Sequence, residues 1–280
     1  MMNLEAQRTK AELLRRLHEG PGLLVLANPW DAGSARIFEQ AGCRALGTTS
    51  AGIAFAHGYA DGERLSRAEM LEAVRRIAAA VAVPVTADME AGFGDSAAEV
   101  VETVRGVLRA GAVGVNLEDA PTGAPGTLFE IAAQAGKIRA VRELAAAEGI
   151  PLVINARTDV YLDQIGAPES RFDHAVERAN AYRDAGADCL YVPGVRDAET
   201  IRRLVQAIRG PLNLLAGPGV PSVAELERLG VRRLSVGSGP MRASLGLTER
   251  LARELLDHGT YTAFTEGALP YAEANQRFRR

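Results

Sequence analysis

The chain has 280 residues, of which 47% are hydrophobic and 5% aromatic, and its formal net charge is −3. This length and apolar content suit one large α/β domain or two small ones. The balance of 32 basic and 35 acidic residues provides no basic face for nucleic acid, and the few aromatic residues argue against a base-stacking surface.

The sequence carries no sign of secretion or membrane insertion. Residues 1–17 lack an apolar signal core, and no run approaches the roughly 20 apolar residues that span a bilayer. Cys43 and Cys189 lie among apolar neighbours without CxxC spacing, so we expect two buried, reduced thiols. We therefore expect a cytoplasmic protein without nucleic-acid or membrane partners.

Short apolar runs alternate with helical stretches along the chain. We expect eight strands, at residues 22–28, 44–50, 83–89, 112–118, 151–157, 189–194, 212–217 and 233–238. Between them, segments such as 66–81 and 96–111 place Ala, Val, Leu and Ile at helical spacing, with Arg and Glu on the opposite face. Ser66 before Glu69 is typical of a capped helix start.

This alternation, without a composition break, favours a closed (β/α)8 TIM barrel over an open doubly wound sheet. No GxGxxG follows the first strand and no GxxxxGK[ST] occurs, which argues against nucleotide binding. About 40 residues follow the last strand, more than one helix needs. We therefore expect a barrel over residues 1–240 and a helical extension of the same domain over 241–280, packed at an oligomer interface.

Polar side chains collect where the predicted strands end, and barrels of this kind build their active sites at that end. Asp88 and Glu90 follow the third strand two residues apart, so strand alternation predicts that they point to the same side. Glu118 follows the fourth strand and Arg157 the fifth. The other polar residues at these ends are Asn28, Asp31, Thr48, Thr49, Ser50, Asn116, Asp119, Asn155 and Asp159.

Carboxylates that share a pocket repel each other unless a cation lies between them. Hard oxygen ligands suit Mg²⁺ or Mn²⁺, and an arginine that faces such an ion can bind a carboxylate with two hydrogen bonds. We infer a 2-oxo acid site in which the metal chelates the substrate, Arg157 holds the remaining charge, and an enolate is stabilised. Ser50 and the backbone N–H groups of Ala51 and Gly52 could add donors.

Each of these residues also has a structural interpretation. A carboxylate at a strand end is often only a helix cap or a solvated loop charge, and Asp119 and Asp159 could be no more than that. Arg157 could merely bridge neighbouring acids, and Asn28 could be a turn residue. His57, after the second strand, is a candidate acid or base, although a surface loop histidine fits the same sequence.

The same residues resemble the isocitrate lyase / phosphoenolpyruvate mutase superfamily, from Asn28 to about Gly239. Its members show an acid-x-acid pair before G-[FY]-G, a later [IL]-E-D and an A-R-T-[DE] strand, and this chain has TADMEAGFGD, GVNLEDA and INARTD in that order. The resemblance implies a (β/α)8 barrel whose last helix is exchanged between subunits of a homotetramer or homodimer. It implies Mg²⁺ with Asp88 as the direct ligand and with Glu90 and Glu118 acting through water.

The resemblance also implies roles for further residues. Asp61, in DGERLS, resembles a family acid on the loop after the second strand. The catalytic candidates are Arg157, Glu118, Asp61 and His57. The candidate substrate-binding residues are Thr48, Ser50, Ala51, Gly52, Asp88, Asn155 and Arg157.

The chain departs from familiar members after the fourth strand. Isocitrate and methylisocitrate lyases carry K-[KR]-C-G-H there, and phosphoenolpyruvate mutases and phosphonopyruvate hydrolases carry Lys and Asn on a longer loop. Here the loop offers no Cys, His or Lys before Lys137. Gly194 and Gly217 match positions where the lyases use Glu and Asn, so a second substrate carboxylate would be poorly held. Glu90 replaces the usual Asp.

We therefore expect a Mg²⁺-dependent carbon–carbon lyase that acts on a small 2-oxo acid or 2-hydroxy-carboxylate through a metal-stabilised enolate. The alternatives are a phosphonopyruvate-type mutase or hydrolase, a decarboxylase of an oxaloacetate-like acid, and a non-catalytic 2-oxo acid binder. The decarboxylase needs the least further machinery. The proton donor stays open among His57, Tyr59 and a metal-bound water, and residues 120–136 have the small-residue composition of a mobile lid.

Overall fold

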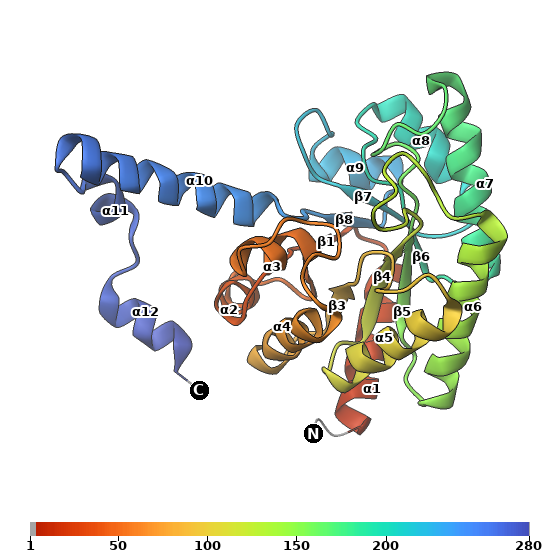
Figure 1. The fold of residues 1–280 in the computed structure, drawn as a ribbon, viewed down its shortest axis with the longest axis horizontal. Helices are drawn as coiled ribbons and strands as arrows, with labels where there is room; N and C mark the ends of the chain where they lie inside the picture. Colours follow the sequence, from red (N-terminus) through yellow and green to blue (C-terminus); the bar gives the residue numbers. More distant parts are fainter. Residues whose placement is uncertain (1–3, 280) are drawn as a thin grey trace.

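The computed structural model describes residues 4–279, and a ring of eight parallel strands with helices outside it forms the centre (Figure 1). The strands are β1 (Leu24–Leu26), β2 (Leu46–Gly47), β3 (Val85–Asp88), β4 (Gly114–Glu118), β5 (Val153–Arg157), β6 (Cys189–Tyr191), β7 (Leu212–Leu215) and β8 (Arg233–Ser235). They pair in the order β1-β8-β7-β6-β5-β4-β3-β2, and a bridge between Ala27 and Leu46 joins β1 to β2. The predicted (β/α)8 barrel is confirmed, with each strand lying inside its predicted run.

Helices surround the ring and close its N-terminal end. They are α1 (Leu4–Glu19), α2 (Ala32–Gln40), α3 (Ser50–Ala56), α4 (Arg67–Ala80), α5 (Ala97–Arg109), α6 (Ile131–Ala147), α7 (Arg171–Asp184), α8 (Ala198–Ala207) and α9 (Val223–Leu229), with a 3₁₀ turn at Pro168–Ser170. Ser66 and Glu69 cap α4 with reciprocal hydrogen bonds, as predicted. Gly230, at φ 95°, ends α9 in the left-handed conformation that only glycine adopts without strain.

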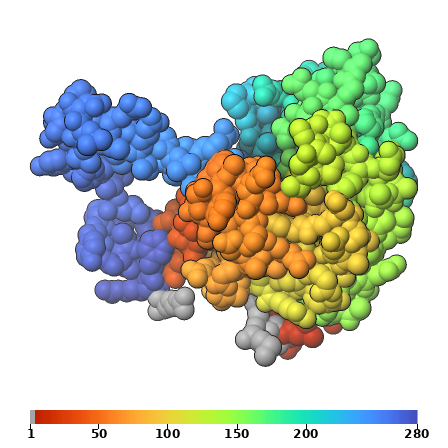
Figure 2. Space-filling view, in the orientation of Figure 1, coloured from red at the N-terminus to blue at the C-terminus, as the bar shows by residue number. Residues whose placement is uncertain are grey.

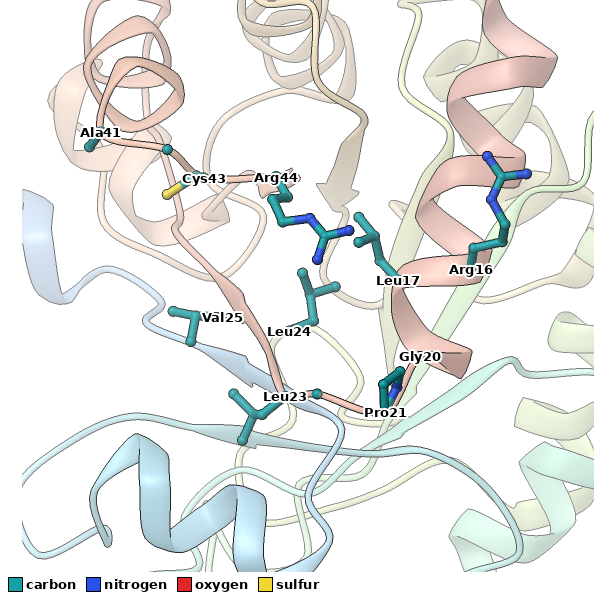
Figure 3. Close-up of a pocket in the computed structure, with 12 residues that line it drawn as sticks. Arg16, Leu17, Gly20, Pro21, Leu23, Leu24, Val25, Ala41, Cys43 and Arg44 are labelled. Carbon is teal, nitrogen blue, oxygen red and sulfur yellow. The ribbon is translucent and has the colours of Figure 1, made fainter.

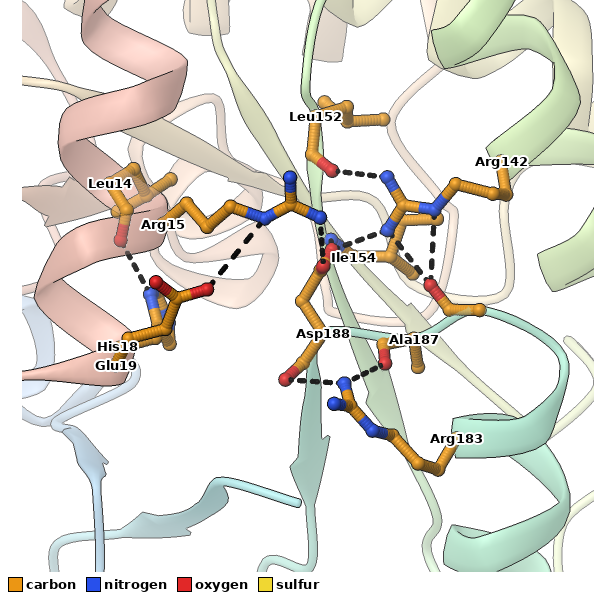
Figure 4. Close-up of polar contacts among 11 residues, drawn as sticks. Leu14, Arg15, His18, Glu19, Arg142, Leu152, Ile154, Arg183, Ala187 and Asp188 are labelled. Carbon is orange, nitrogen blue, oxygen red and sulfur yellow. Dashed lines mark hydrogen bonds and ion pairs between the residues drawn. The ribbon is translucent and has the colours of Figure 1, made fainter. Parts of the chain in front are cut away.

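Helix α1, for which the sequence analysis made no prediction, closes the N-terminal end of the barrel. Its residues Leu14 and His18 are buried. Figure 4 shows Arg15 of α1 beside Asp188, the residue before β6, where Arg142 of α6 also pairs with Asp188. With this end plugged, the opposite end, where the strands finish, is the one left for a site.

The expected burial of both thiols is half right. Cys189 is buried inside the barrel, whereas Cys43 is only half-buried, and both are free. Cys43 follows the C-terminal end of α2 and lines a surface cavity of about 480 Å³. Among residues 4–279, no helix is both long and apolar enough to cross a membrane.

The chain after β8 leaves the barrel as a C-terminal arm, residues 239–279. The arm contains α10 (Gly239–Arg253), a π-helical turn (Glu254–His258), α11 (Thr262–Gly267) and α12 (Tyr271–Phe278). Figures 1 and 2 show α10 projecting away from the barrel and the chain returning toward α2. There Arg36 donates to the carbonyl of Arg279 at 3.0 Å and Gln40 to that of Arg277 at 2.8 Å.

Because α10 projects outward, it leaves part of the barrel uncovered. Leu24 and Leu26 of β1 are buried, but Val25 between them, which points outward, is 40% exposed. Figure 3 shows Val25 beside a cavity of about 480 Å³, which residues of α1, β1 and the segment before β2 line. A helix normally covers this face in a (β/α)8 barrel.

Candidate active site

Strand β3 ends in Asp88, whose carboxylate is fixed by the segment that follows β2. The backbone N–H and the hydroxyl of Ser50 both donate to Asp88 Oδ2, at 3.0 and 2.9 Å. The backbone N–H of Asp88 donates to Thr48 Oγ1 at 2.9 Å. Among residues 4–279, Asp88 Oδ1 receives a single long contact, of 3.4 Å from Asn116 Nδ2. Oδ1 therefore keeps acceptor capacity for a ligand.

Glu90 reaches the site by a different route from the one predicted. Strand β3 stops at Asp88 and Glu90 has φ 51°, so strand alternation does not set its direction. Instead Glu90 Oε2 accepts from the backbone N–H of Glu63 at 2.7 Å, and Glu63 Oε1 accepts from the N–H of Phe93 at 2.8 Å. These two hydrogen bonds hold the loop before α4 against the end of β3. They also hold the backbone of Glu90 in its strained left-handed conformation.

The environment of Glu90 disfavours its charge. Its side chain is buried, and burial, followed by the negative charges of Asp61 and Asp88, raises the pKa of Glu90 to about 8. Asp61 is exposed overall, but part of its side chain is buried. This partial burial, and then the charge of Asp88, raise the pKa of Asp61 as well. Asp61, Asp88 and Glu90 therefore form one acidic cluster at the barrel mouth.

Arg157, at the end of β5, faces the end of β4. Its Nη1 pairs with Glu118 Oε2 at 2.7 Å and its Nε with Asp159 Oδ1 at 2.6 Å. Burial raises the pKa of Glu118 well above its usual value, against the opposing charge of Arg157. Burial likewise raises the pKa of Asp159 to about 6. Arg157 does bridge two acids, and these pairs leave Nη2 for a further anion.

Asp119 and Asp159 are not the solvated loop charges that the sequence allowed, because both side chains are buried. Asp119 Oδ2 accepts from the hydroxyl of Tyr182 at 2.7 Å and from Arg178 Nη1 at 3.2 Å. Asp119 Oδ1 accepts from the backbone N–H of Asp159 at 3.0 Å. Asp119 therefore fixes Asp159, which in turn fixes the guanidinium of Arg157.

Two of the predicted asparagines, Asn28 and Asn155, make defined contacts. Asn28 Nδ2 donates to the carbonyls of Gly47 and Thr48, and its Oδ1 accepts from the N–H groups of Val236 and Gly237, all at 2.8–3.0 Å. It thereby ties the end of β1 to the ends of β2 and β8, where ladder hydrogen bonds are sparse.

Asn155 of β5 lies inside the barrel and donates from Nδ2 to Asn116 Oδ1 at 2.7 Å. Asn155 Oδ1 is buried without a hydrogen-bond partner among residues 4–279. A buried acceptor of this kind normally has a partner, so Asn155 Oδ1 is open to a water or a ligand.

Other predicted residues contribute less directly in this conformation. Thr49 caps α3, because its Oγ1 accepts from the backbone N–H of Gly52 at 3.2 Å, and Ala51 is half-buried in the first turn of α3. His57 follows α3 and lines a cavity of about 420 Å³ with Trp30. The acidic cluster is built from other residues, and the catalytic role of His57 stays a prediction.

Lys137, the first basic residue after Glu118, contacts Phe129 in the loop after β4. Lys137 lies in α6, its side chain is buried, and its Nζ is 3.4 Å from the centroid of the Phe129 ring. Burial lowers the pKa of Lys137. Its position beneath the loop indicates packing against Phe129.

The acids suit a hydrated divalent cation better than a closed protein cage. Within residues 4–279, no three His, Cys, Asp or Glu side chains converge closely enough to ligate one ion together. Asp88 Oδ1 keeps acceptor capacity, and the carboxyl groups of Glu90 and Glu118, whose pKa values are raised mainly by burial, interact electrostatically with Asp88. Mg²⁺ usually binds one or two carboxylates and keeps several waters, so these residues could hold it.

Comparison with known proteins adds to this geometry. Residues 14–256 match the phosphoenolpyruvate phosphomutase family. The chain belongs to this family. A solved structure from Burkholderia cenocepacia J2315, described as a candidate lyase or mutase, is 40% identical with a TM-score of 0.92, and the match covers 99% of this chain and 98% of that one.

Two further relatives have named activities. Oxaloacetate decarboxylase of Rhodopseudomonas palustris (strain HaA2) is 30% identical over 274 residues, which is 95% of this chain and 88% of that protein. The structure of oxaloacetate acetylhydrolase with its product oxalate is 26% identical with a TM-score of 0.85, covering 96% of this chain and 93% of that one. The protein is thus a lyase-type enzyme of the isocitrate lyase / phosphoenolpyruvate mutase superfamily, as the resemblance predicted.

The structure explains one departure of this phosphoenolpyruvate phosphomutase family member from the lyases. Gly194, where the lyases use Glu, has φ 91°, and a Cβ built there would lie 2.8 Å from the backbone nitrogen of Leu162. A side chain at Gly194 would therefore require the backbone around Leu162 to move. Gly217 is exposed, and a side chain at that position would extend into open space.

Proposed function

We propose that the protein is a Mg²⁺-dependent carbon–carbon lyase of small 2-oxo acids, and that decarboxylation of an oxaloacetate-like acid is the reaction its residues fit best. One observation carries the proposal. Arg157 at the end of β5 is held by Glu118 and Asp159, and Asp88 ends β3 on the other side of β4, so a cation and a candidate metal ligand lie at nearby strand ends of the barrel mouth. That arrangement suits a substrate with a carboxylate next to a keto group.

The roles of the residues follow from their contacts. Arg157 binds the C1 carboxylate through Nη2, while Glu118 and Asp159 keep its guanidinium oriented. Asp88 is the direct metal ligand, and Thr48 and Ser50 fix its carboxylate. A Mg²⁺ ion held there would supply positive charge where the enolate oxygen develops.

The chemistry needs no acid or base from the loop after β4. In oxaloacetate the bond between C3 and C4 breaks, its electron pair moves through C2 to the keto oxygen, and CO₂ leaves. A proton from solvent then adds to C3 of the enolate and gives pyruvate. A retro-aldol cleavage would instead require a base for a hydroxyl proton, and residues 119–136 contain no Cys, His or Lys. The named activities of the two relatives, which both act on oxaloacetate, favour the same substrate class.

We also propose that the C-terminal arm covers the bare face of β1 in another subunit, in a homodimer or homotetramer. The arm carries apolar side chains that are 42–85% exposed, namely Leu245, Leu247, Leu255, Leu256, Tyr261 and Phe264. The outward face of β1 beside Val25 is likewise left uncovered. Exposed apolar surface of this extent on both sides favours association.

The reaction is tested by incubating the protein with oxaloacetate, isocitrate, methylisocitrate or phosphonopyruvate and following products by NMR, with Mg²⁺ or with EDTA. We expect pyruvate from oxaloacetate only with Mg²⁺, at a rate above a protein-free control. Oxalate and acetate would indicate hydrolysis of the same substrate, and phosphate from phosphonopyruvate would favour carbon–phosphorus chemistry. Consumption of none of the four acids would contradict the proposal.

A further inference from the structure

A buried arginine lies inside the barrel beneath the acidic cluster. Arg233 of β8 is fully buried and is the largest fully buried side chain among residues 4–279. Its guanidinium lies between His18 of α1, at the closed end of the barrel, and Asn116, in the middle of β4. An arginine keeps its charge even when burial lowers its pKa, as it does here.

The groups that Arg233 contacts are neutral. Its Nη2 donates to Asn116 Oδ1 at 3.1 Å and its Nε to Ser235 Oγ at 3.3 Å, and its Nη1 lies 3.5 Å from His18 Nε2. Burial, and then the charge of Arg233, lowers the pKa of His18 to about 4, so this histidine is uncharged near neutral pH. A cation surrounded by neutral groups in a barrel core is costly to bury, and an apolar residue of similar shape would fill the space without that cost.

Arg233 determines which way Asn116 points. Asn116 Oδ1 accepts from Arg233 Nη2 at 3.1 Å and from Asn155 Nδ2 at 2.7 Å. Two donors at the oxygen fix the amide, so its NH₂ group faces Asp88 Oδ1 at 3.4 Å. Asp88 Oδ1 is the oxygen that Ser50 leaves open.

We propose that Arg233 is a positioning residue for the active site, acting through Asn116 to orient Asp88 and offsetting the negative charge of the acidic cluster from below. The inference rests on the proposed function, because it takes Asp88 as the ligand that holds the metal. A buried cation is effective at this range because the barrel interior screens charge weakly. Binding of a metal and an anionic substrate therefore depends on a residue that touches neither.

The test compares Arg233→Met with Arg232→Met. The control makes the same chemical change one residue earlier, where the side chain hydrogen bonds to the carbonyls of Gly20 and Pro21 at the closed end of the barrel. Binding of Mn²⁺, with oxalate as the anion, is measured by electron paramagnetic resonance. We expect Arg233→Met to weaken Mn²⁺–oxalate binding at least about tenfold, the size of one lost charge-assisted interaction, and Arg232→Met to leave it unchanged.

Two further variants separate positioning from mere packing. Arg233→Lys keeps the charge but cannot reach Ser235 and Asn116 together, so it should recover part of the affinity and also serves if Arg233→Met does not fold. In a double-mutant cycle with Asn116→Leu, the losses should be strongly non-additive, because both substitutions interrupt one path to Asp88.

The outcomes distinguish this inference from the function on which it rests. Equal Mn²⁺–oxalate affinity in the wild-type protein and in the folded Arg233 variants would overturn the inference alone. Additive losses in the cycle would overturn the path through Asn116. A wild-type protein that binds no Mn²⁺–oxalate would overturn the proposed function, and the inference with it.

Discussion

Without a metal, Glu90 should make the protein less stable as the pH rises. Its pKa is about 8 in the folded chain against a usual value of 4.5, so the native state binds more protons than the unfolded state between these values. The free energy of unfolding therefore falls as the pH rises through this window, and the protonated group's contribution is lost above pH 8. At 1.36 kcal/mol per pH unit, the gap corresponds to at most about 5 kcal/mol.

The perturbation that isolates this effect is Glu90→Gln, which keeps an oxygen for the N–H of Glu63 but cannot ionise. Urea unfolding followed by circular dichroism would be measured in EDTA at several values from pH 5 to pH 8.5. The variant should lose less stability than the wild-type protein over this range, by about 2 to 5 kcal/mol. Excess Mg²⁺ should flatten the wild-type curve, because a cation offsets the charge. Parallel curves for the two proteins in EDTA would refute the reasoning.

Arg157→Met should weaken oxalate binding about a hundredfold, and should also destabilise the fold by about 3 to 5 kcal/mol, because Glu118 and Asp159 lose their buried partner. Full stability at pH 8 would contradict that pairing. Asp88→Asn should remove the Mg²⁺ dependence of oxalate binding in calorimetry, and an unchanged metal effect would locate the metal elsewhere. Leu256→Glu, at a side chain that is 85% exposed, should lower the oligomer mass in sedimentation equilibrium, whereas an unchanged mass would exclude Leu256 from the interface.

The features that depend on local sequence could be predicted. Runs of six or seven residues between amphipathic helices predicted all eight strands, because a buried parallel strand needs side chains that are apolar on both faces. The ends of those strands then predicted the neighbourhood of Asp88, Glu118 and Arg157. The predicted strands were longer than the observed ones, as at Leu46–Gly47, because only the residues that pair with a neighbouring strand form the ladder.

The features that depend on distant contacts could not be predicted. Glu90 is buried by a hydrogen bond from Glu63, 27 residues earlier, and no local pattern encodes that closure. Asp119 looked like a loop charge because its partners Arg178 and Tyr182 lie about 60 residues later on α7. Arg233 stood at the start of the predicted strand 233–238, where no local pattern indicated that its guanidinium would lie inside the barrel.

The measurement that tests the central claim most directly is the fate of uniformly ¹³C-labelled oxaloacetate with the wild-type protein and with Asp88→Asn, in Mg²⁺ and in EDTA. Because Mg²⁺ alone slowly decarboxylates oxaloacetate, the variant serves as the matched background. The account predicts labelled pyruvate and CO₂ well above that background with wild-type protein and Mg²⁺, and none above it in EDTA. Equal rates for the wild-type protein and Asp88→Asn in Mg²⁺ would contradict it.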